Sequence, residues 1–358
     1  MWTVRGLFPT LCDPAHLDRA ITAATAGKRR RRDVAWLLFR REEVVADLAA
    51  RLAAGTWEPA GYEIVRVRDP KPRAIARAPI EDRVVHAAVV ACLEPVLYRG
   101  LRPEAFACRP GFGTHRAVLR LLDLMRRHRF ALHLDICAYF PSIDVAILRA
   151  LLARRVRDAP FLEVVDRILE SGAGLYRDFG LRTFAGLTDA WPPPGRGLPI
   201  GACTSQVLAA HLYLEAFDHF VKRDLRVQGY LRYVDDQFLF GDRRADLLRW
   251  RGEIARWLET ERGLRLKHPE ARVLSCHGHL DALGFRLRRE GVEPRARTLT
   301  RMQARVRAAV RPGRRDPAAP EVGRSLAATA GLAMFAAMAG RVRKDRQQEA
   351  APAAGTGG

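Results

Sequence analysis

The chain has 358 residues, a formal net charge of +21 and a hydrophobic content of 48%. That hydrophobic content excludes an intrinsically disordered chain, and six scattered cysteines without a CxxC pair exclude a disulfide framework. The excess of positive charge favours a polyanionic partner such as a nucleic acid. No apolar run is long enough to span a membrane and no signal-peptide core is present, so we expect a cytoplasmic protein without a membrane partner.

The first part of the chain is predicted to be mostly helical. A basic run at residues 28–32 is equally consistent with a solvated charge cluster and with a contact to a nucleic-acid strand. Apolar residues then recur at helical spacing over 34–52. Residues 62–76 predict a β-hairpin, and two helices follow over 80–97 and 114–128.

The remainder alternates helices with short strands. Helices are predicted over 145–155, 161–171, 204–224 and 244–258, with a hairpin over 272–288. After Gly291 the chain becomes helical, basic and alanine-rich, which indicates a separate small domain.

Two acidic motifs at the ends of strand-like runs are the most informative feature. Residues 130–135 end in Asp135, and residues 229–240 contain Asp235 and Asp236 within Tyr-Val-Asp-Asp. Three carboxylates that meet on a sheet would repel one another unless cations lay between them. Two Mg²⁺ ions, about 3.5–4 Å apart, are typical of in-line phosphoryl displacement, so these motifs predict a nucleic-acid polymerase. The alternative is an ordinary exposed Asp-Asp turn.

Two further polar groups invite a functional interpretation. Asp144, nine residues after Asp135, could be a fourth carboxylate, but the N-cap of a helix starting at Val145 is better supported. Residues 276–279, Cys-His-Gly-His, could bind metal, but a polar turn is favoured because no second ligand cluster accompanies them.

The order of motifs resembles prokaryotic reverse transcriptases, most closely those of diversity-generating retroelements. The resemblance covers residues 27–288, and its supporting segments are 79–86, 109–116, 135–144 and 200–206. The Ser-Gln ending of the last segment differs from the Ser-Pro usual in group II intron enzymes, and the Val-Thr-Gly of retrons is absent.

The resemblance implies an α+β right-hand polymerase. The fingers would comprise residues 1–130 and 150–200, the palm residues 131–149 and 201–290, a helical thumb residues 291–345, and a disordered tail residues 346–358.

The resemblance also implies roles for the acidic residues. Asp135 and Asp235 would bridge two Mg²⁺ ions, for which Mn²⁺ could substitute, and Asp236 would tune the catalytic ion. The peptide oxygen of Ile136 is an expected extra ligand. The lysine pair that relatives carry after His-Pro is missing, so Lys267 or Arg272 would have to replace the general acid.

For the incoming nucleotide, the resemblance implies basic fingers residues and a ring that excludes the 2′-hydroxyl. Arg73 is favoured over Lys71 for the triphosphate, because a guanidinium can chelate phosphate oxygens. The dNTP-binding residues expected on this basis are Lys71, Arg73, Ala138, Tyr139, Phe140, Ile200 and Gly201, and those expected to contact template or primer are Arg109, Gln206 and Tyr233.

Three of these residues carry a specific expectation. Phe140 is the excluding ring, although it could instead be a core aromatic. Gly201 is expected to let the backbone approach the incoming base pair. Ile200 stands where many relatives have glutamine, and the loss of that amide is our hypothesis for error-prone copying opposite template adenines.

The expected function is therefore RNA-directed DNA synthesis with mutagenic retrohoming. The partners implied by the resemblance are an RNA template, a DNA or RNA primer, dNTPs and a small basic accessory protein. The alternatives are a defence-associated reverse transcriptase, of the abortive-infection or CRISPR-linked type, and a catalytically silent RNA-binding scaffold.

Overall fold

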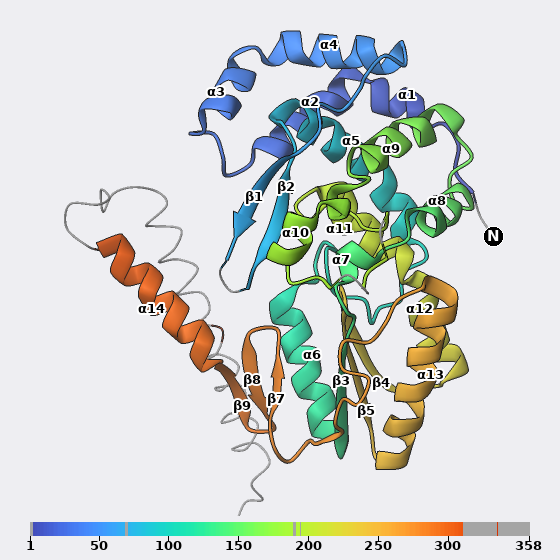
Figure 1. The fold of residues 1–358 in the computed structure, drawn as a ribbon, viewed down its shortest axis with the longest axis vertical. Helices are drawn as coiled ribbons and strands as arrows, with labels where there is room; N and C mark the ends of the chain where they lie inside the picture. The colour runs from blue at the N-terminus through green and yellow to red at the C-terminus, as the bar shows by residue number, and fades with distance from the viewer. Residues whose placement is uncertain (1–2, 69–70, 189–190, 194, 311–334, 336–358) are drawn as a thin grey trace, which may run out of the picture.

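The computed structural model describes residues 3–68, 71–188, 191–193, 195–310 and 335 (Figure 1). Helices gather at the top of the molecule in this view, a β-hairpin descends from them, and an antiparallel sheet lies below. This mixture of helices and antiparallel sheet confirms the predicted α+β class. Within the described part of the chain, no helix combines the length and apolar character needed to cross a membrane.

The upper layer is built from N-terminal helices packed on one long helix. Its members are α1 (Leu7–Cys12), α2 (Pro14–Thr25), α3 (Arg32–Phe39), α4 (Arg41–Ala53) and α5 (Ile80–Tyr98). α2 begins after Asp13, whose carboxylate accepts hydrogen bonds from the first-turn amides of Ala15 and His16 (both 3.2 Å). The single helix predicted over 34–52 is in fact α3 and α4, because Arg40 leaves helical geometry (φ −100°, ψ 28°).

The predicted hairpin is confirmed. β1 (Glu63–Val67) pairs antiparallel with β2 (Arg73–Arg77), with Val67 opposite Arg73. The tip of its turn, residues 69–70, lies outside the described residues. The short helix α10 (Phe179–Phe184) lies against β2.

The central sheet has four antiparallel strands in the order β4, β5, β3, β6. Their bounds are β3 (Phe130–Asp135), β4 (Gly229–Tyr233), β5 (Asp236–Gly241) and β6 (Leu274–Ser275). The apolar residues of these strands alternate between its faces. Leu231, Phe238 and Phe240 face α6 (Thr114–Arg127), whereas Leu132, Leu134 and Leu239 pack with α13 (Arg244–Arg262). The sheet is therefore held between two hydrophobic clusters.

The segments that frame this sheet depart in part from the predicted helices. α7 (Tyr139–Ser142), α8 (Val145–Ala153) and α9 (Ala159–Ser171) follow β3. The prediction of one continuous helix over 204–224 is wrong. This segment consists of shorter helical elements, namely α11 (Cys203–Val207), η2 (Leu208–Tyr213), α12 (Glu215–His219) and η3 (Phe220–Asp224). The chain breaks at Leu214 (φ −108°, ψ 11°), where the Tyr213 carbonyl accepts a hydrogen bond from Arg262 Nε (2.7 Å).

A second sheet leads into the last described helix. β7 (Leu280–Ala282), β8 (Phe285–Arg288) and β9 (Gly291–Pro294) form an antiparallel meander, and α14 (Ala296–Val310) follows. The prediction of helix directly after Gly291 is wrong, because residues 291–294 pair with β8 and bury Val292. Most of the predicted thumb beyond α14, and all of the predicted tail, lie outside the described residues.

Candidate active site

The sheet register brings the three predicted aspartates to one end of the central strands. Asp135 is the last residue of β3 and Asp236 the first of β5, and the two are direct antiparallel partners. Asp235 lies in the two-residue turn between Tyr233 and Asp236, which are themselves partners across β4 and β5. Residues a hundred positions apart in the sequence are thus neighbours in space.

The electrostatics of Asp235 agree with this proximity. Burial is the largest cause that raises the pKa of its carboxyl group to about 7, followed by repulsion from Asp236 and then from Asp135. Lys71 opposes this rise, which places the Lys71 ammonium group within electrostatic reach of Asp235. The exposed Arg73 begins β2. The structure therefore links Lys71, the less favoured of the two predicted fingers cations, to the acidic end of the sheet.

Two cationic or polar side chains contact the carboxylates. Lys267 Nζ lies 2.7 Å from Asp135 Oδ2, and this hydrogen bond is the main cause that raises the pKa of the Lys267 ammonium group. His133 Nε2 lies 2.7 Å from Asp236 Oδ1, and its ring stacks on Phe238 (centroids 4.5 Å apart). Between the two residues predicted as replacements for the missing lysine pair, Lys267 is therefore the one at the site.

His133 was missed by the sequence reasoning, although a signal was present. It precedes Asp135 by two residues in β3, and side chains two apart in a strand point to the same face. A histidine at that spacing from a predicted metal ligand can be predicted as its neighbour in space.

The donor set suits a divalent cation, but its members are partnered by other side chains. Aspartate oxygens are the ligands that Mg²⁺ and Mn²⁺ prefer. The raised pKa of Asp235 means that an added positive charge between the carboxylates would be stabilising. Among the described residues, no three His, Cys, Asp or Glu side chains are already grouped to hold a metal ion. A cation that binds through Asp135 Oδ2 or Asp236 Oδ1 would take the place of Lys267 or His133 at that oxygen.

The acidic turn is supported from behind by a buried ion pair. Val234 adopts a left-handed conformation (φ 57°), which is strained for a β-branched residue. Its carbonyl accepts a hydrogen bond from Arg232 Nη1 (3.0 Å). Arg232 in turn makes a two-point contact with Asp218, through Nε–Oδ1 (2.7 Å) and Nη2–Oδ2 (2.6 Å), and Tyr230 also donates to Asp218 (2.8 Å). The side chains of Arg232 and Asp218 are only 1% and 0% exposed.

The segment after Asp135 contains Tyr139 and Phe140, two of the predicted nucleotide-binding residues, and these two rings differ in burial. Ala138 has a left-handed backbone (φ 46°) that starts α7, and Ile136 is buried directly after β3. Phe140 is half-buried, with its ring edge-on to Tyr139 (centroids 5.7 Å apart). The Tyr139 side chain is buried and donates to the Ala209 carbonyl (2.6 Å). Its ring is thus part of the core, so only its backbone remains available to a nucleotide.

Gly201 lies close to the hairpin strand β2. The Ile200 carbonyl accepts a hydrogen bond from the Ala76 amide of β2 (2.7 Å). Gly201 has φ 119°, and a Cβ atom there would lie 2.8 Å from the Ala76 carbonyl oxygen and 3.0 Å from Ile75 Cγ2. The close approach that requires glycine is therefore to the hairpin strand β2.

Replacing Gly201 by alanine is expected to destabilise the protein by at least about 1 kcal/mol, because the new methyl group meets backbone and φ is unfavourable. Urea unfolding measures this effect. Gly252→Ala is a matched control, since that exposed glycine lies in α13 with open space around it. The control is expected to gain roughly 0.5–1 kcal/mol. Equal effects of the two changes would contradict the packing argument.

The predicted template and primer residues do not form one cluster of contacts. Gln206 is exposed on α11. The Tyr233 hydroxyl is within 2.9 Å of Thr114 Oγ1. Arg109 lies over the ring of Phe112 (4.2 Å to the centroid) and donates to a backbone carbonyl. Gln206 alone of the three presents an exposed side chain.

The structure confirms that Asp144 is a helix cap and that the Cys-His-Gly-His segment at residues 276–279 lies in a turn. Asp144 caps α8, with its carboxylate accepting from Ala146 N (2.9 Å) and Ile147 N (3.2 Å). Residues 275–279 form a turn, in which the Gly278 amide donates to the Ser275 carbonyl (3.0 Å).

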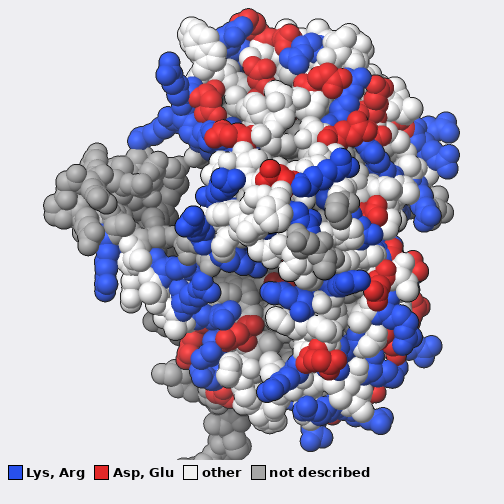
Figure 2. Space-filling model, in the orientation of Figure 1, with Lys and Arg blue, Asp and Glu red and all other residues white. Residues whose placement is uncertain are grey.

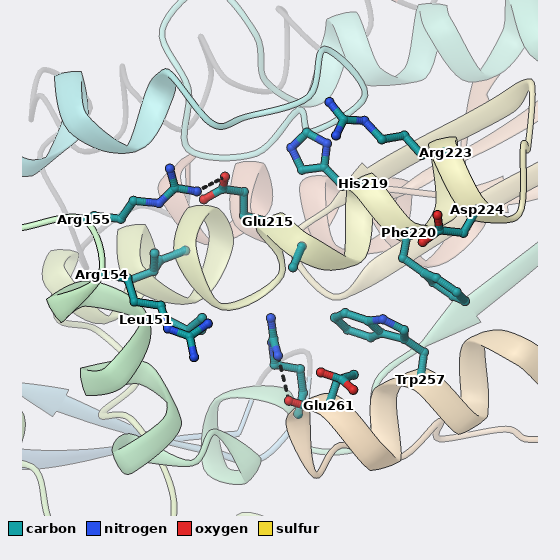
Figure 3. Close-up of a pocket in the computed structure, with 13 residues that line it drawn as sticks. Leu151, Arg154, Arg155, Glu215, His219, Phe220, Arg223, Asp224, Trp257 and Glu261 are labelled. Carbon is teal, nitrogen blue, oxygen red and sulfur yellow. Dashed lines mark hydrogen bonds and ion pairs between the residues drawn. The ribbon is translucent and has the colours of Figure 1, made fainter. Parts of the chain in front are cut away.

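Other surface features lie around the site. Figure 2 shows Lys and Arg side chains along the central hollow of the molecule and over its upper left edge, where α3 lies. A cavity of about 510 Å³ opens between α8, α12 and α13 (Figure 3), and none of the three aspartates lines it. Two of the polar side chains that line it, Arg155 and Glu215, pair with each other (2.5 Å).

Comparison with known proteins agrees with this architecture. Residues 67–287 match the protein family described as reverse transcriptase (RNA-dependent DNA polymerase). Protein YkfC of Escherichia coli (strain K12) is 24% identical over 220 residues, which are 60% of this chain and 51% of YkfC. The chain thus spans about half the length of the curated relative it matches.

Solved structures that match the chain share little sequence with it. A chain of a partial Cas6-RT-Cas1–Cas2 complex is 18% identical with a TM-score of 0.37, and the match covers 71% of this chain and 43% of that one. The apo telomerase of Candida tropicalis is 9% identical with a TM-score of 0.46, and the match covers 73% and 54% of the two chains.

Proposed function

This chain belongs to the reverse transcriptase (RNA-dependent DNA polymerase) family, and we propose that it adds deoxynucleotides to a primer 3′ end on an RNA template. The observation that carries the proposal is the register of the central sheet, in which Asp135 and Asp236 are direct partners and Asp235 is in the adjoining turn. In this proposal the hairpin β1–β2 belongs to the fingers, the central sheet is the palm, and α14 begins the thumb.

Asp135 and Asp235 are the proposed ligands of two Mg²⁺ ions, with Asp236 beside them and the peptide oxygen of Ile136 as a further donor. When bound, such ions would lower the pKa of the primer hydroxyl and stabilise the leaving pyrophosphate. The contribution of the chain itself is to hold three carboxylates at one strand end, on a turn fixed by the buried Arg232.

Lys267 is the proposed general acid. Its ammonium group carries a proton at neutral pH that it can donate to the leaving phosphate oxygen. The 2.7 Å contact between Lys267 Nζ and Asp135 Oδ2 supports this role, because it shows that the Lys267 side chain reaches the end of the sheet where the aspartates meet. Lys71, which acts electrostatically on Asp235, is proposed to contact the triphosphate together with Arg73.

Replacing Phe140 by alanine is expected to increase ribonucleotide incorporation relative to deoxynucleotide incorporation by about tenfold or more, because the ring no longer blocks the 2′-hydroxyl. Single-nucleotide extension with matched dNTP and rNTP measures this ratio. Tyr139→Phe is the control, since that ring is already packed in the core and its selectivity should stay the same. An unchanged ratio in Phe140→Ala would show that Phe140 is only a core aromatic.

We propose further that the chain serves mutagenic retrohoming in a diversity-generating retroelement, with a small basic accessory protein as partner. The support is the combination of motifs at residues 79–86, 109–116 and 200–206, with Ile200 in place of glutamine. Two near-identical repeats that differ at adenines, close to the coding sequence, would support this subtype. Neighbouring abortive-infection or CRISPR genes without such repeats would favour the defence-associated alternative.

One assay distinguishes the proposed polymerase from the alternative, a catalytically silent RNA-binding scaffold. Primer extension on an RNA template, with Asp236→Ala as the inactive control, is expected to yield DNA product with the native chain only. RNA binding without extension by the native chain would favour the scaffold.

A further inference from the structure

We propose that the outer face of α3 binds the unpaired part of the template RNA by base stacking. This inference rests on the proposed function, since it assigns a second contact to the template strand. The surface, called the α3 patch below, consists of Arg32, Trp36, Phe39, Arg40 and Arg77.

Two large aromatic rings are exposed side by side in the α3 patch. Trp36 is 60% exposed and Phe39 is 82% exposed. They are three residues apart on one helix and their rings stack, with centroids 6.0 Å apart and planes inclined by 27°. Single exposed apolar residues are common, but two adjacent rings of this size form a platform that is costly to leave in water.

Positive charge surrounds these rings. The guanidinium carbon of Arg40 lies 5.8 Å from the centroid of the Trp36 ring, and this arginine pairs with Glu43 just as Arg77 pairs with Glu63. The preceding basic run contributes Arg29, Arg30 and Arg32, and none of these three has an ion-pair partner within the described parts of the chain. The carboxylate of the neighbouring Asp33 is already neutralised, because it contacts Arg31 (2.7 Å) and Arg83 (3.3 Å).

The combination of exposed aromatic faces with nearby guanidinium groups, of which that of Arg32 has no ion pair among the described residues, is the chemistry that recognises single-stranded nucleic acid. Bases stack on the rings regardless of sequence, while arginines contact the phosphates. An acidic protein could satisfy the charge but would leave the flat rings without flat partners. A second copy of this chain would bring a net charge of +21 against a basic surface.

The position of the α3 patch fits the template. A groove of about 1130 Å³ runs from Trp36 and Phe39 to Arg77 at the end of β2. Figure 1 shows α3 at the outer edge of the upper layer, beside β1 and β2. The same strand reaches the expected nucleotide site, since the amide of Ala76, the residue before Arg77, donates to the Ile200 carbonyl (2.7 Å). Template bases that have not yet been copied are unpaired and would pass along this hairpin.

The test is the affinity of the full chain for labelled RNA–DNA duplexes, measured by fluorescence anisotropy in the Asp236→Ala background. The duplexes are blunt, carry a 5′ overhang of the template RNA, or carry a 3′ overhang of the primer. The double variant Trp36→Leu/Phe39→Leu is expected to bind the 5′-overhang duplex about tenfold more weakly, with no change for the other two. Phe179→Leu, which removes another exposed ring from α10, is the matched control and should bind all three duplexes normally.

Three results would overturn the inference: unchanged binding of the 5′ overhang, an equal loss for all three duplexes, or a change in oligomeric state with normal RNA binding. Trp36→Tyr/Phe39→Tyr keeps the aromatic faces and is expected to retain affinity, which separates loss of stacking from misfolding. Because binding is read without catalysis, failure of primer extension by the native chain would disprove the proposed function alone. Extension with unchanged overhang binding would disprove the α3 patch alone.

Discussion

Replacing Asp235 by asparagine is expected to reduce primer extension by at least about a thousandfold, or about 4 kcal/mol in the barrier, because one proposed ligand of both ions is lost. The same change is expected to stabilise the metal-free protein at pH 8. In the native fold, burial and the two neighbouring carboxylates raise the pKa of Asp235 to about 7. The unfolded chain therefore releases this proton at lower pH than the folded chain does, and stability falls as pH rises from about 4 to 7.

An asparagine removes that pH-dependent loss. The gain above pH 7 is at most about 4 kcal/mol, from three pKa units, and solvent screening of the partly exposed side chain reduces it. Thermal unfolding in EDTA at pH 5 and pH 8 measures the gain, which should be larger at pH 8. Asp144→Asn is a matched control, because Asp144 is a helix cap that is not among the charges that raise the pKa of Asp235, and its loss should not stabilise the fold. Retained extension, or no added stability at pH 8, would count against the converging carboxylates.

Replacing Asp218 by alanine is expected to lower the free energy of unfolding by about 3–5 kcal/mol, because Arg232 would be left buried without its counter-charge. This is a large part of the stability of an ordinary domain. The loss should also weaken primer extension at temperatures where the fold persists. The reason is that Arg232 donates a hydrogen bond to the carbonyl of Val234, whose backbone is strained. Val234 and Asp235 form the same turn.

Urea unfolding and extension assays measure both effects. The double variant Asp218→Leu/Arg232→Met is expected to recover most of the lost stability, since an apolar pair can replace a buried ion pair. It should not recover extension, because the donor to the Val234 carbonyl is absent. Full activity in the double variant would mean that the turn keeps its shape without Arg232.

The sequence was sufficient to predict the parts of this fold that local periodicity determines. Strand alternation and the acidic strand ends predicted the meeting of Asp135 with Asp235 and Asp236, and an N-cap pattern predicted the role of Asp144. The hairpin of β1 and β2 followed from its β-branched residues and turn signal.

The features that were missed depend on tertiary contacts. Lys267 was one of the two predicted replacements for the general acid, but no local pattern relates it to Asp135, 132 positions away, or Arg232 to a carboxylate on another element. The break of the predicted helix at Leu214 also depends on a tertiary contact, because Arg262 from α13 donates a hydrogen bond to the Tyr213 carbonyl there. The requirement for glycine at position 201 could be predicted, but its partner could not, since β2 approaches only in the folded chain.

The most direct test of the central claim is a crystal structure with Mn²⁺, used as an anomalous scatterer, together with a primer–template and a dNTP. We predict two anomalous peaks about 3.5–4 Å apart, each coordinated by carboxylate oxygens of Asp135 or Asp235, with Lys267 and His133 displaced from their present partners. Peaks elsewhere, or carboxylates that keep their contacts with Lys267 and His133 while no ion binds between them, would contradict the account.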